Sequence, residues 1–397
     1  MRLSRRIDAI VPGAEDGWSV YYRAQEMRDA GHPIVMLTIG DHDVPTDPAI
    51  CAAMKRGIDD GRLGYAPVEG IPELRTALAA RESANRGPVS VDEIAVTAGG
   101  QAGLFAAMMA VLDPGDSAVV LSPYYATYEQ TVRAAGGRPI VVGCPSENGF
   151  LPDISTIEAA LAPDTRAILV NTPNNPTGAV YPEATIDALA DLCLRRDLWM
   201  ISDEVYASQV WEGRHISPRE RPGMRERTFV VNSFSKSHAM TGSRLGWLIG
   251  PKDAIWAVGD LMIATTYGQP GFIQAAGAWA LREGAAGEAE IRARYARRRA
   301  AALAALVDAG PLRVVAPAGG MYLMIDVRAT GLSGADFAER LLDAEGIAVM
   351  PGESFGAAAA GHLRVALTVP EAALCDAIAR IVAFARQDTV RSTAVAG

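Results

Sequence analysis

Between residue 94 and about residue 250, short apolar runs alternate with segments in which apolar residues recur at helical spacing. The runs are continuous stretches rich in Val, Ile and Leu, which is typical of strands buried on both faces of a sheet. The seven runs are residues 94–97, 118–121, 139–142, 167–171, 198–202, 228–231 and 245–249. The helical segments between them include residues 101–112, 125–135, 154–162 and 183–196. This pattern predicts an α/β fold in which a mostly parallel seven-stranded sheet is covered by helices.

The two ends of the chain have a different pattern. Residues 17–30 have helical spacing, and the strand-like residues 34–39 end at Gly40. After about residue 285, a long Arg-rich helical stretch leads into short strands that alternate with helices. The expected strands are residues 312–315, 321–326, 347–350 and 362–366, and the expected helices are residues 334–345 and 370–386. We interpret this region as a smaller α+β domain.

These patterns divide the chain into three parts. Residues 46–285 are the predicted large domain, and residues 286–397 are the predicted small C-terminal domain. Residues 1–45 are an N-terminal segment that we expect to contribute to the small domain.

Three local features give further expectations. Asp47 is a predicted cap for a helix that begins near Pro48. The basic run 292–299 has helical spacing, which predicts a solvated helix face. The tail, residues 389–397, is made mostly of small residues and is predicted to be disordered.

Charge and composition argue against several classes of protein. The 397 residues carry a formal net charge of −9, and no block of Lys or Arg offsets it, so we expect neither nucleic acid nor a membrane as a partner. No apolar run approaches the roughly 20 residues that a membrane helix needs. The 4 cysteines show no C-x-x-C spacing and the 5 histidines no H-x-x-x-H spacing, so no metal site is expected. Scattered cysteines fit a reducing compartment, and we expect a cytoplasmic protein.

Four of the predicted strands end in distinctive polar residues. The sets are Gly99-Gly100-Gln101, Asn174-Asn175, Asp203 with Tyr206, and Lys236. Because ligands gather beyond the carboxyl ends of strands in parallel sheets, these side chains can converge on one site. Taken singly, each set has an ordinary explanation, such as a turn, a helix cap or an exposed lysine. Their recurrence at strand ends makes coincidence the weaker explanation.

The stretch from Ser233 to Arg244 carries the clearest chemistry. Lys236 follows a buried strand within a small, hydroxyl-rich turn, and Arg244 lies between two glycines. A lysine amine held beside a ligand can act as a Schiff-base nucleophile, and an arginine fork suits a phosphate. The hydroxyl groups of Ser233 and Ser235 also suit an anion in this place.

Together, these motifs resemble those of a known family. The order Asn175-Pro176-Thr177-Gly178, Asp203-Glu204-Val205-Tyr206, Ser233-Phe234-Ser235-Lys236 and Gly242-x-Arg244-x-Gly246 resembles that of the class I and II aminotransferases. These are fold type I enzymes that depend on pyridoxal 5′-phosphate (PLP). The resemblance extends from the Gly40 turn to Arg364 and implies the PLP-dependent transferase fold type I, with PLP bound by the large domain.

The resemblance implies roles for four residues at the reacting end of PLP. Lys236 matches the Schiff-base lysine, which also moves a proton at the substrate Cα. Asp203 matches the carboxylate that pairs with the pyridinium nitrogen and keeps the ring able to accept electrons. Asn175 and Tyr206 match the two groups that hydrogen-bond the 3′-oxygen of the cofactor.

Further matches surround the phosphate and the ring. The lysine stretch supplies the expected phosphate ligands Arg244, Ser233 and Ser235. The segment that opens a helix after residue 97, where free N–H groups favour a phosphate, supplies Gly100, Gln101 and Ala102. Tyr125 matches an aromatic ring stacked on the pyridine, with core packing as the alternative. Tyr65 matches a tyrosine that reaches the phosphate of the neighbouring subunit, which implies a homodimer with shared active sites.

The resemblance also implies a substrate site. Arg364 matches the arginine that binds the substrate α-carboxylate through a bidentate pair. An arginine in an apolar strand would be costly to bury without such a partner, which independently favours a site. Gly40 matches a backbone contact to the same carboxylate, and Asn175 is expected beside it.

The implied reaction is the transfer of an amino group from an L-amino acid to a 2-oxo acid by a ping-pong route through Lys236. The main alternative is a carbon–sulfur β-lyase or a related elimination enzyme, which shares every PLP motif. An effector-sensing domain of a transcription regulator would need an attached DNA-binding unit, and the chain has no room for one before Gly40. Gln101 stands where some aspartate-preferring relatives carry a basic residue. We therefore expect a small or moderately apolar donor such as alanine, with 2-oxoglutarate or pyruvate as the acceptor.

Overall fold

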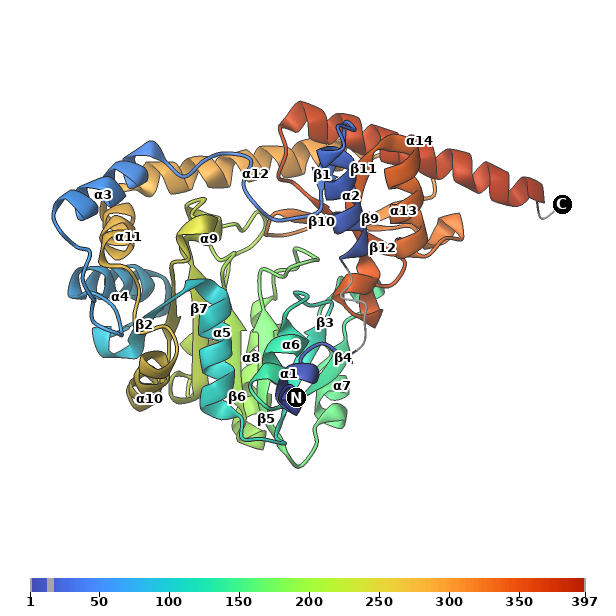
Figure 1. Cartoon of the computed structure of the whole chain (residues 1–397). Helices are drawn as coiled ribbons and strands as arrows, with labels where there is room; N and C mark the ends of the chain where they lie inside the picture. Colours follow the sequence, from blue (N-terminus) through green and yellow to red (C-terminus); the bar gives the residue numbers. More distant parts are fainter. Residues whose placement is uncertain (1, 13–17, 396–397) are drawn as a thin grey trace.

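The computed structural model describes residues 2–12 and 18–395 and contains two sheets, one of seven strands and one of five. Figure 1 shows the large sheet with its helices in the lower part of the molecule and the small sheet at the upper right. The long helix α12 (Ala285–Ala305) runs across the top from one part to the other.

The large sheet has the strand order β2-β8-β7-β6-β5-β3-β4. All neighbouring pairs are parallel except those made by β8, which is antiparallel to both of its neighbours. The strands are β2 (Ile94–Thr97), β3 (Ser117–Ser122), β4 (Arg138–Gly143), β5 (Thr165–Asn171), β6 (Trp199–Asp203), β7 (Thr228–Ser233) and β8 (Gly246–Ile249). The seven predicted strands and their mostly parallel arrangement are confirmed.

Helices pack on both faces of this sheet. One apolar core lies between the sheet and α5 (Gly99–Val111), α6 (Tyr128–Ala134) and α10 (Lys252–Ala264). Another lies against α7 (Ile154–Ala160) and α8 (Glu183–Arg196). Helix α6 begins at Tyr128, three residues later than predicted, and in the preceding loop Tyr124 N donates to the carbonyl oxygen of Phe355 (3.1 Å), in the 3₁₀ turn Gly352–Phe355.

The helices α3 (Pro48–Asp59), α4 (Pro72–Arg86) and α11 (Gly271–Glu283) pack together at the β2 and β8 side of the sheet. Asp47 caps α3, since its Oδ1 accepts a hydrogen bond from Ala49 N at 2.8 Å. The predicted cap is confirmed.

The small sheet has the order β1-β11-β12-β10-β9. Its strands are β1 (Val35–Leu37), β9 (Arg313–Val315), β10 (Tyr322–Asp326), β11 (Ile347–Pro351) and β12 (His362–Ala366). Strand β1 pairs parallel with β11, so the N-terminal segment joins the same sheet as the C-terminal strands. The helices of this part are α2 (Ser19–Asp29), α13 (Gly334–Glu345) and α14 (Glu371–Val395), and the short α1 (Arg5–Asp8) precedes them. The domain limits at residues 45 and 285 stay a prediction.

Two local predictions are wrong. The basic run of α12 is not a solvated face throughout, because Arg298 is buried and pairs with Asp43 (2.6 Å). The predicted disordered tail is helical as far as Val395, where α14 ends, and residues 396–397 lie outside the described residues. Within the described part of the chain, no helix combines the length and the apolar character that crossing a membrane requires.

Candidate active site

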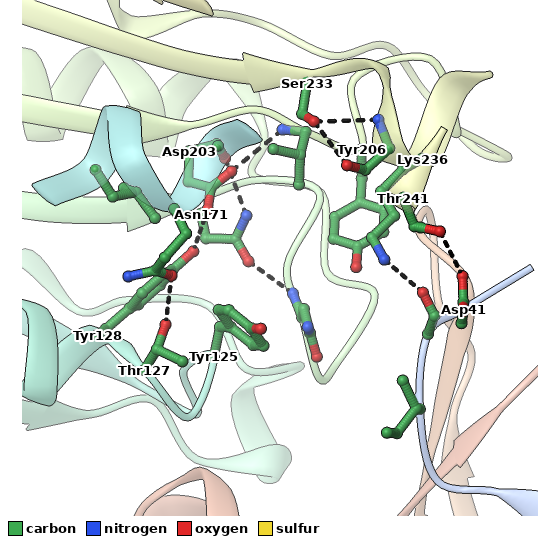
Figure 2. Close-up of a pocket in the computed structure, with 18 of the residues that line it drawn as sticks. Asp41, Tyr125, Thr127, Tyr128, Asn171, Asp203, Tyr206, Ser233, Lys236 and Thr241 are labelled. Carbon is green, nitrogen blue, oxygen red and sulfur yellow. Dashed lines mark hydrogen bonds between the residues drawn. The ribbon is translucent and has the colours of Figure 1, made fainter. Parts of the chain in front are cut away.

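A cavity of about 500 Å³ lies at the ends of β5, β6 and β7 (Figure 2). The large sheet, the N-terminal segment and the small sheet all contribute to its wall. Twelve of the residues predicted from the sequence line it: Gly40, Gly100, Gln101, Tyr125, Asn175, Asp203, Tyr206, Ser233, Ser235, Lys236, Arg244 and Arg364. Ala102 and Tyr65 are the two predicted residues that do not.

Lys236 lies on α9 (Phe234–Ser237), a single helical turn that follows β7 directly. The turn is capped by Ser233, whose Oγ accepts from Ser235 N at 3.1 Å, and Phe234 anchors it in the core. The Lys236 amine enters the cavity and donates to the carbonyl oxygen of Gly40. Gly40 suits this place because the Tyr322 hydroxyl lies where a Cβ would be.

Asp203 is the last residue of β6 and is buried. Its carboxylate accepts hydrogen bonds from Tyr128 Oη (2.7 Å) and from Val205 N (3.2 Å). Burial raises the pKa of Asp203 to about 6, although these two hydrogen bonds favour its charged form. The carboxylate is therefore a buried acid that lacks a cationic partner among the described residues.

The other end of the cavity has the features of an anion site. Helix α5 begins at Gly99, and no described side chain caps its first turn, so its first amides are available to a ligand. The guanidinium of Arg244 packs directly against Gly99, which has a positive φ of 77°. Ser233 Oγ and Ser235 Oγ lie 2.9 Å apart beside them. Ala102 belongs to this first helical turn but not to the cavity wall.

Tyr125 and Gln101 form one side wall. Tyr125 lines the cavity and also packs edge-on against Tyr128, with ring centroids 5.8 Å apart. The side chain of Gln101 is fixed by two hydroxyl groups: it donates to Thr131 Oγ1 (2.7 Å) and accepts from Thr127 Oγ1 (2.8 Å). Gln101 is thus a neutral residue held in one orientation.

Arg364 comes from β12 of the small sheet and is buried. Its guanidinium packs against two aromatic rings, with Cζ 4.5 Å from the Tyr322 centroid and 4.4 Å from the Phe355 centroid. Nη1 donates to Asn175 Oδ1 (3.0 Å), and Nη2 donates to the Thr38 carbonyl oxygen. Among the described residues no carboxylate pairs with Arg364, and its buried Nε has no partner. A buried cation without an anion calls for an anionic ligand.

Tyr206 links the two parts of the molecule. Its hydroxyl lies 3.1 Å from that of Tyr322, which belongs to β10 of the small sheet. Burial raises the pKa of Tyr206 well above its usual value, so the hydroxyl stays protonated and can donate.

Tyr65 lies outside the cavity. Its side chain is 90% exposed and contacts Tyr267, with ring centroids 5.1 Å apart.

Ten lining residues were not predicted: Trp18, Ile39, Asp41, Leu104, Thr127, Tyr128, Asn171, Val205, Thr241 and Tyr322. Asn171 ends β5, and its position at a strand end was a signal that could have found it. Tyr128 follows the predicted Tyr125 by three residues, but only the fold shows that it reaches Asp203. Trp18 and Tyr322 come from distant elements, and no local pattern marks them.

The described residues hold no group of three or more His, Cys, Asp and Glu side chains placed to bind a metal ion. The cavity instead combines an amine, a buried carboxylate, an anion site and an unpaired buried arginine.

Comparison with known proteins adds to this geometry. The sequence profile described as "Aminotransferase class I and II" matches residues 32–381. The chain belongs to this family. An arginine–pyruvate transaminase of Pseudomonas aeruginosa is 41% identical over 382 residues, which cover 96% of this chain and 97% of the relative. An aspartate/prephenate aminotransferase of Thermus thermophilus is 41% identical over 389 residues, which cover 97% and 98% of the two chains.

Solved aminotransferase structures have the same fold. A mutant aspartate aminotransferase of Thermus thermophilus superimposes with a TM-score of 0.91 at 40% identity, covering 97% of this chain and 100% of that chain. An aspartate aminotransferase of Thermotoga maritima gives a TM-score of 0.90 at 32% identity, covering 96% and 99%. The protein is an aminotransferase of fold type I, and the family to which it belongs uses PLP.

Proposed function

We propose that this aminotransferase binds PLP in the cavity around Lys236 and moves an amino group from an L-amino acid to a 2-oxo acid by a ping-pong route. The observation that carries the proposal is the meeting of Lys236, Asp203 and Arg364 in one cavity. These three residues come from different elements, and none of them is paired with an oppositely charged side chain among the described residues.

The cavity residues fit PLP. The buried carboxylate of Asp203, with a pKa raised to about 6, would gain a cationic partner in the pyridinium nitrogen. The first amides of α5, the hydroxyls of Ser233 and Ser235, and Arg244 would hold the phosphate. Tyr125 would lie against the ring face, and Asn175 and Tyr206 would hydrogen-bond its 3′-oxygen.

PLP, when bound, supplies an aldehyde carbon that bonds to an amino group and a ring that takes up an electron pair. Lys236 Nζ then accepts the proton that leaves the substrate Cα and returns it later in the reaction. Arg364 binds the α-carboxylate with Asn175 and the backbone of Gly40 beside it. Asp203 would hold a negative charge beside the ring nitrogen.

The donor is the open part of the proposal. The relatives include an arginine–pyruvate transaminase and an aspartate/prephenate aminotransferase, so arginine and aspartate belong in any donor screen. Gln101 offers a fixed amide rather than a charge, which supports an uncharged donor such as alanine. Pyruvate or 2-oxoglutarate is the proposed acceptor.

The experiment is a donor screen on the PLP-loaded enzyme. A true donor should bleach the PLP absorbance band when no oxo acid is present, and an acceptor should restore it. Release of pyruvate and ammonia without an acceptor would instead indicate the carbon–sulfur β-lyase. A chain that takes up no PLP would overturn the proposal.

We further propose a homodimer in which Tyr65 reaches the neighbouring subunit. Large apolar side chains that are more than half exposed support this: Leu63, Tyr65, Trp256, Ile263 and Tyr267. Light scattering should give twice the chain mass.

We also propose a cytoplasmic location, which the 4 free cysteine thiols support. Residues 46–285 are the proposed PLP-binding domain.

A further inference from the structure

A second cavity, of about 420 Å³, lies on the other side of α9 (Phe234–Ser237), the helical turn that carries Lys236. We call α9 the lysine turn and this cavity the rear cavity. It is lined by Arg81, Glu82, Arg86, Ala207, Ser208, His215, Asn232, Ser237 and Glu288. Asn232 and Ser237 face it, whereas Ser233, Ser235 and Lys236 between them in the chain face the active-site cavity. One thin wall, the end of β7 with α9, therefore separates the two.

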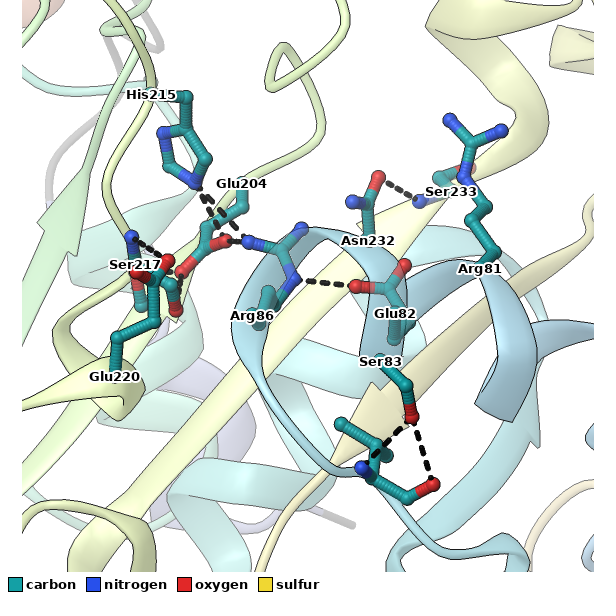
Figure 3. A network of polar contacts seen from close by, with 12 residues as sticks. Arg81, Glu82, Ser83, Arg86, Glu204, His215, Ser217, Glu220, Asn232 and Ser233 are labelled. Atoms are coloured by element: carbon teal, nitrogen blue, oxygen red, sulfur yellow. Dashed lines mark hydrogen bonds and ion pairs between the residues drawn. The ribbon is translucent and has the colours of Figure 1, made fainter.

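Two successive carboxylates at the end of β6, Asp203 and Glu204, lie toward different cavities. Asp203 lines the active-site cavity, and the next residue, Glu204, belongs to the polar network of the rear cavity (Figure 3). The carboxylate of Glu204 is fully buried. Its Oε1 accepts from Ser202 Oγ (2.8 Å) and Ser217 Oγ (2.7 Å), and its Oε2 lies 2.7 Å from His215 Nε2.

Arg86 neutralises this buried charge. It is the last residue of α4, and its side chain is only 3% exposed. Nη1 pairs with Glu204 and Nε pairs with Glu82, one helical turn earlier, so the guanidinium lies between two carboxylates (Figure 3). Burial alone would raise the pKa of Glu204, but Arg86 and His215 lower it to about 2. Glu204 is thus a permanent negative charge beside Asp203.

Neighbouring like charges disfavour each other, so the state of Glu204 affects Asp203 directly. The groups that face Asp203 are Tyr128 and Tyr125 from the α6 side, Lys236 from α9, and Glu204 on its own turn. The groups around Glu204 are Arg86 and Glu82 from α4, His215 from the following loop, and Glu220 from the 3₁₀ turn Pro218–Glu220. Among these, Arg86 is the one permanent cation.

We propose that Arg86 is a positioning residue of the active site, which neutralises Glu204 and so leaves Asp203 charged for the cofactor. This inference rests on the proposed PLP site. Arg86 touches neither substrate nor cofactor and acts through Glu204, across the β6 end. Without Arg86, an uncompensated carboxylate would lie next to Asp203 and favour its protonation.

The test is PLP affinity against pH, measured by fluorescence with the dimeric full-length apoenzyme and no substrate. In the wild type, affinity should fall as acid protonates Asp203. Arg86→Gln should move the midpoint of this fall up by about one pH unit, because Glu204 loses its partner. Glu204→Gln should move the midpoint down, and the double variant should return close to the wild type. The titration of PLP itself is common to all variants and cancels.

Two controls separate this role from simple folding support. Arg81→Gln removes the other arginine of the rear cavity, which pairs with Glu288, and should leave the midpoint unchanged. Arg86→Lys keeps a positive charge and should keep the wild-type midpoint even if thermal stability falls. If Arg86→Gln does not fold, the midpoints of Glu204→Gln and Arg86→Lys still test the inference. Equal midpoints in all folded variants, or shifts of the same sign in both single variants, would overturn the inference. No PLP binding by the wild type would instead overturn the proposed function.

Discussion

The two cavities on either side of the lysine turn use charge in opposite ways. In the rear cavity every arginine has its own carboxylate: Arg86 pairs with Glu204 and Glu82, and Arg81 pairs with Glu288. In the active-site cavity, Lys236 donates to a carbonyl oxygen, Asp203 has no cation, and Arg364 has no carboxylate among the described residues. Each arginine of the rear cavity is thus paired with a carboxylate, whereas Lys236, Asp203 and Arg364 have no oppositely charged partner among the described residues. Matched substitutions on the two sides can test this difference.

The largest difference should appear at adjacent residues of the lysine turn. Lys236→Ala removes the group that we propose moves the proton, so kcat should fall by about 10⁴-fold. Ser237→Ala, on the rear side of the same turn, should change kcat by less than about tenfold. Single-turnover absorbance measurements would compare the two. Transamination by Lys236→Ala at the wild-type rate would remove the proposed role.

The second comparison sets Arg364, which is buried, against the half-buried Arg81 of the rear cavity. Arg364→Lys loses the fork that we propose binds the α-carboxylate, and kcat/KM should fall by about 10²-fold, mostly through KM. Arg81→Lys keeps a charge opposite Glu288 and should leave kcat/KM within about twofold. Steady-state kinetics with a fixed acceptor measure both. Equal losses would mean that Arg364 acts only as a structural residue.

The third comparison concerns stability of the apoenzyme. Burial raises the pKa of Asp203 to about 6 in the folded chain, against roughly 4 in the unfolded chain, so its charge destabilises the fold above pH 6 by about 3 kcal/mol. Stability from this group is gained as the pH falls through 6, and Asp203→Asn should raise the free energy of unfolding at pH 7.

The charge of Glu204 has the opposite effect on the free energy of unfolding. Its pKa of about 2 is depressed, so it stabilises the fold above its unfolded value near 4, and this stability is lost as the pH falls toward 2. Glu204→Gln should therefore lower the free energy of unfolding at pH 7 by about 3 kcal/mol. Denaturant titrations at pH 7 and pH 5 compare the two variants. Destabilisation by both substitutions at pH 7 would contradict the contrast.

The smallest expected effect is at Tyr128, whose hydroxyl donates to Asp203. Tyr128→Phe removes one hydrogen bond to the charged form, so kcat should fall by about tenfold or less and the pKa of Asp203 should rise. The pH profile of PLP absorbance measures the change. A profile identical to the wild type would show that the hydrogen bond does not influence Asp203.

The sequence predicted the large sheet well because its buried strands leave a strong local signal. Every strand from β2 to β8 is an apolar run, and the polar residues at their ends converge as parallel topology requires. Lys236, Asp203 and Asn175 were found in this way. Arg364 was found through its place in a family motif and its cost of burial in an apolar strand.

Contacts between residues far apart in the chain could not be predicted from the sequence. The burial of Arg298 depends on Asp43, more than 250 positions away, and helical spacing alone suggested solvent. No local pattern marks Tyr128 or Tyr322. Only the fold brings Tyr128 against Asp203 and Tyr322 against Arg364. The rear cavity could not be predicted from the sequence either. Its arginines lie in an amphipathic helix, where charged residues are ordinary, and Glu204 directly follows Asp203, to which the family motif drew attention.

The two rings beside Arg364 have a stereochemical consequence. Tyr322 and Phe355 both pack against the guanidinium, which limits the directions from which a carboxylate can approach it. The side chain is already confined to one rotamer, and the entropy cost of ordering an arginine, up to about 2 kcal/mol, falls on folding rather than on substrate binding. A carboxylate held in one plane leaves few orientations for the adjacent Cα. If Arg364 fixes the carboxylate and the amino group is also fixed, only one enantiomer can direct its Cα hydrogen toward Lys236, so the two rings would contribute one of the contacts that choose between enantiomers.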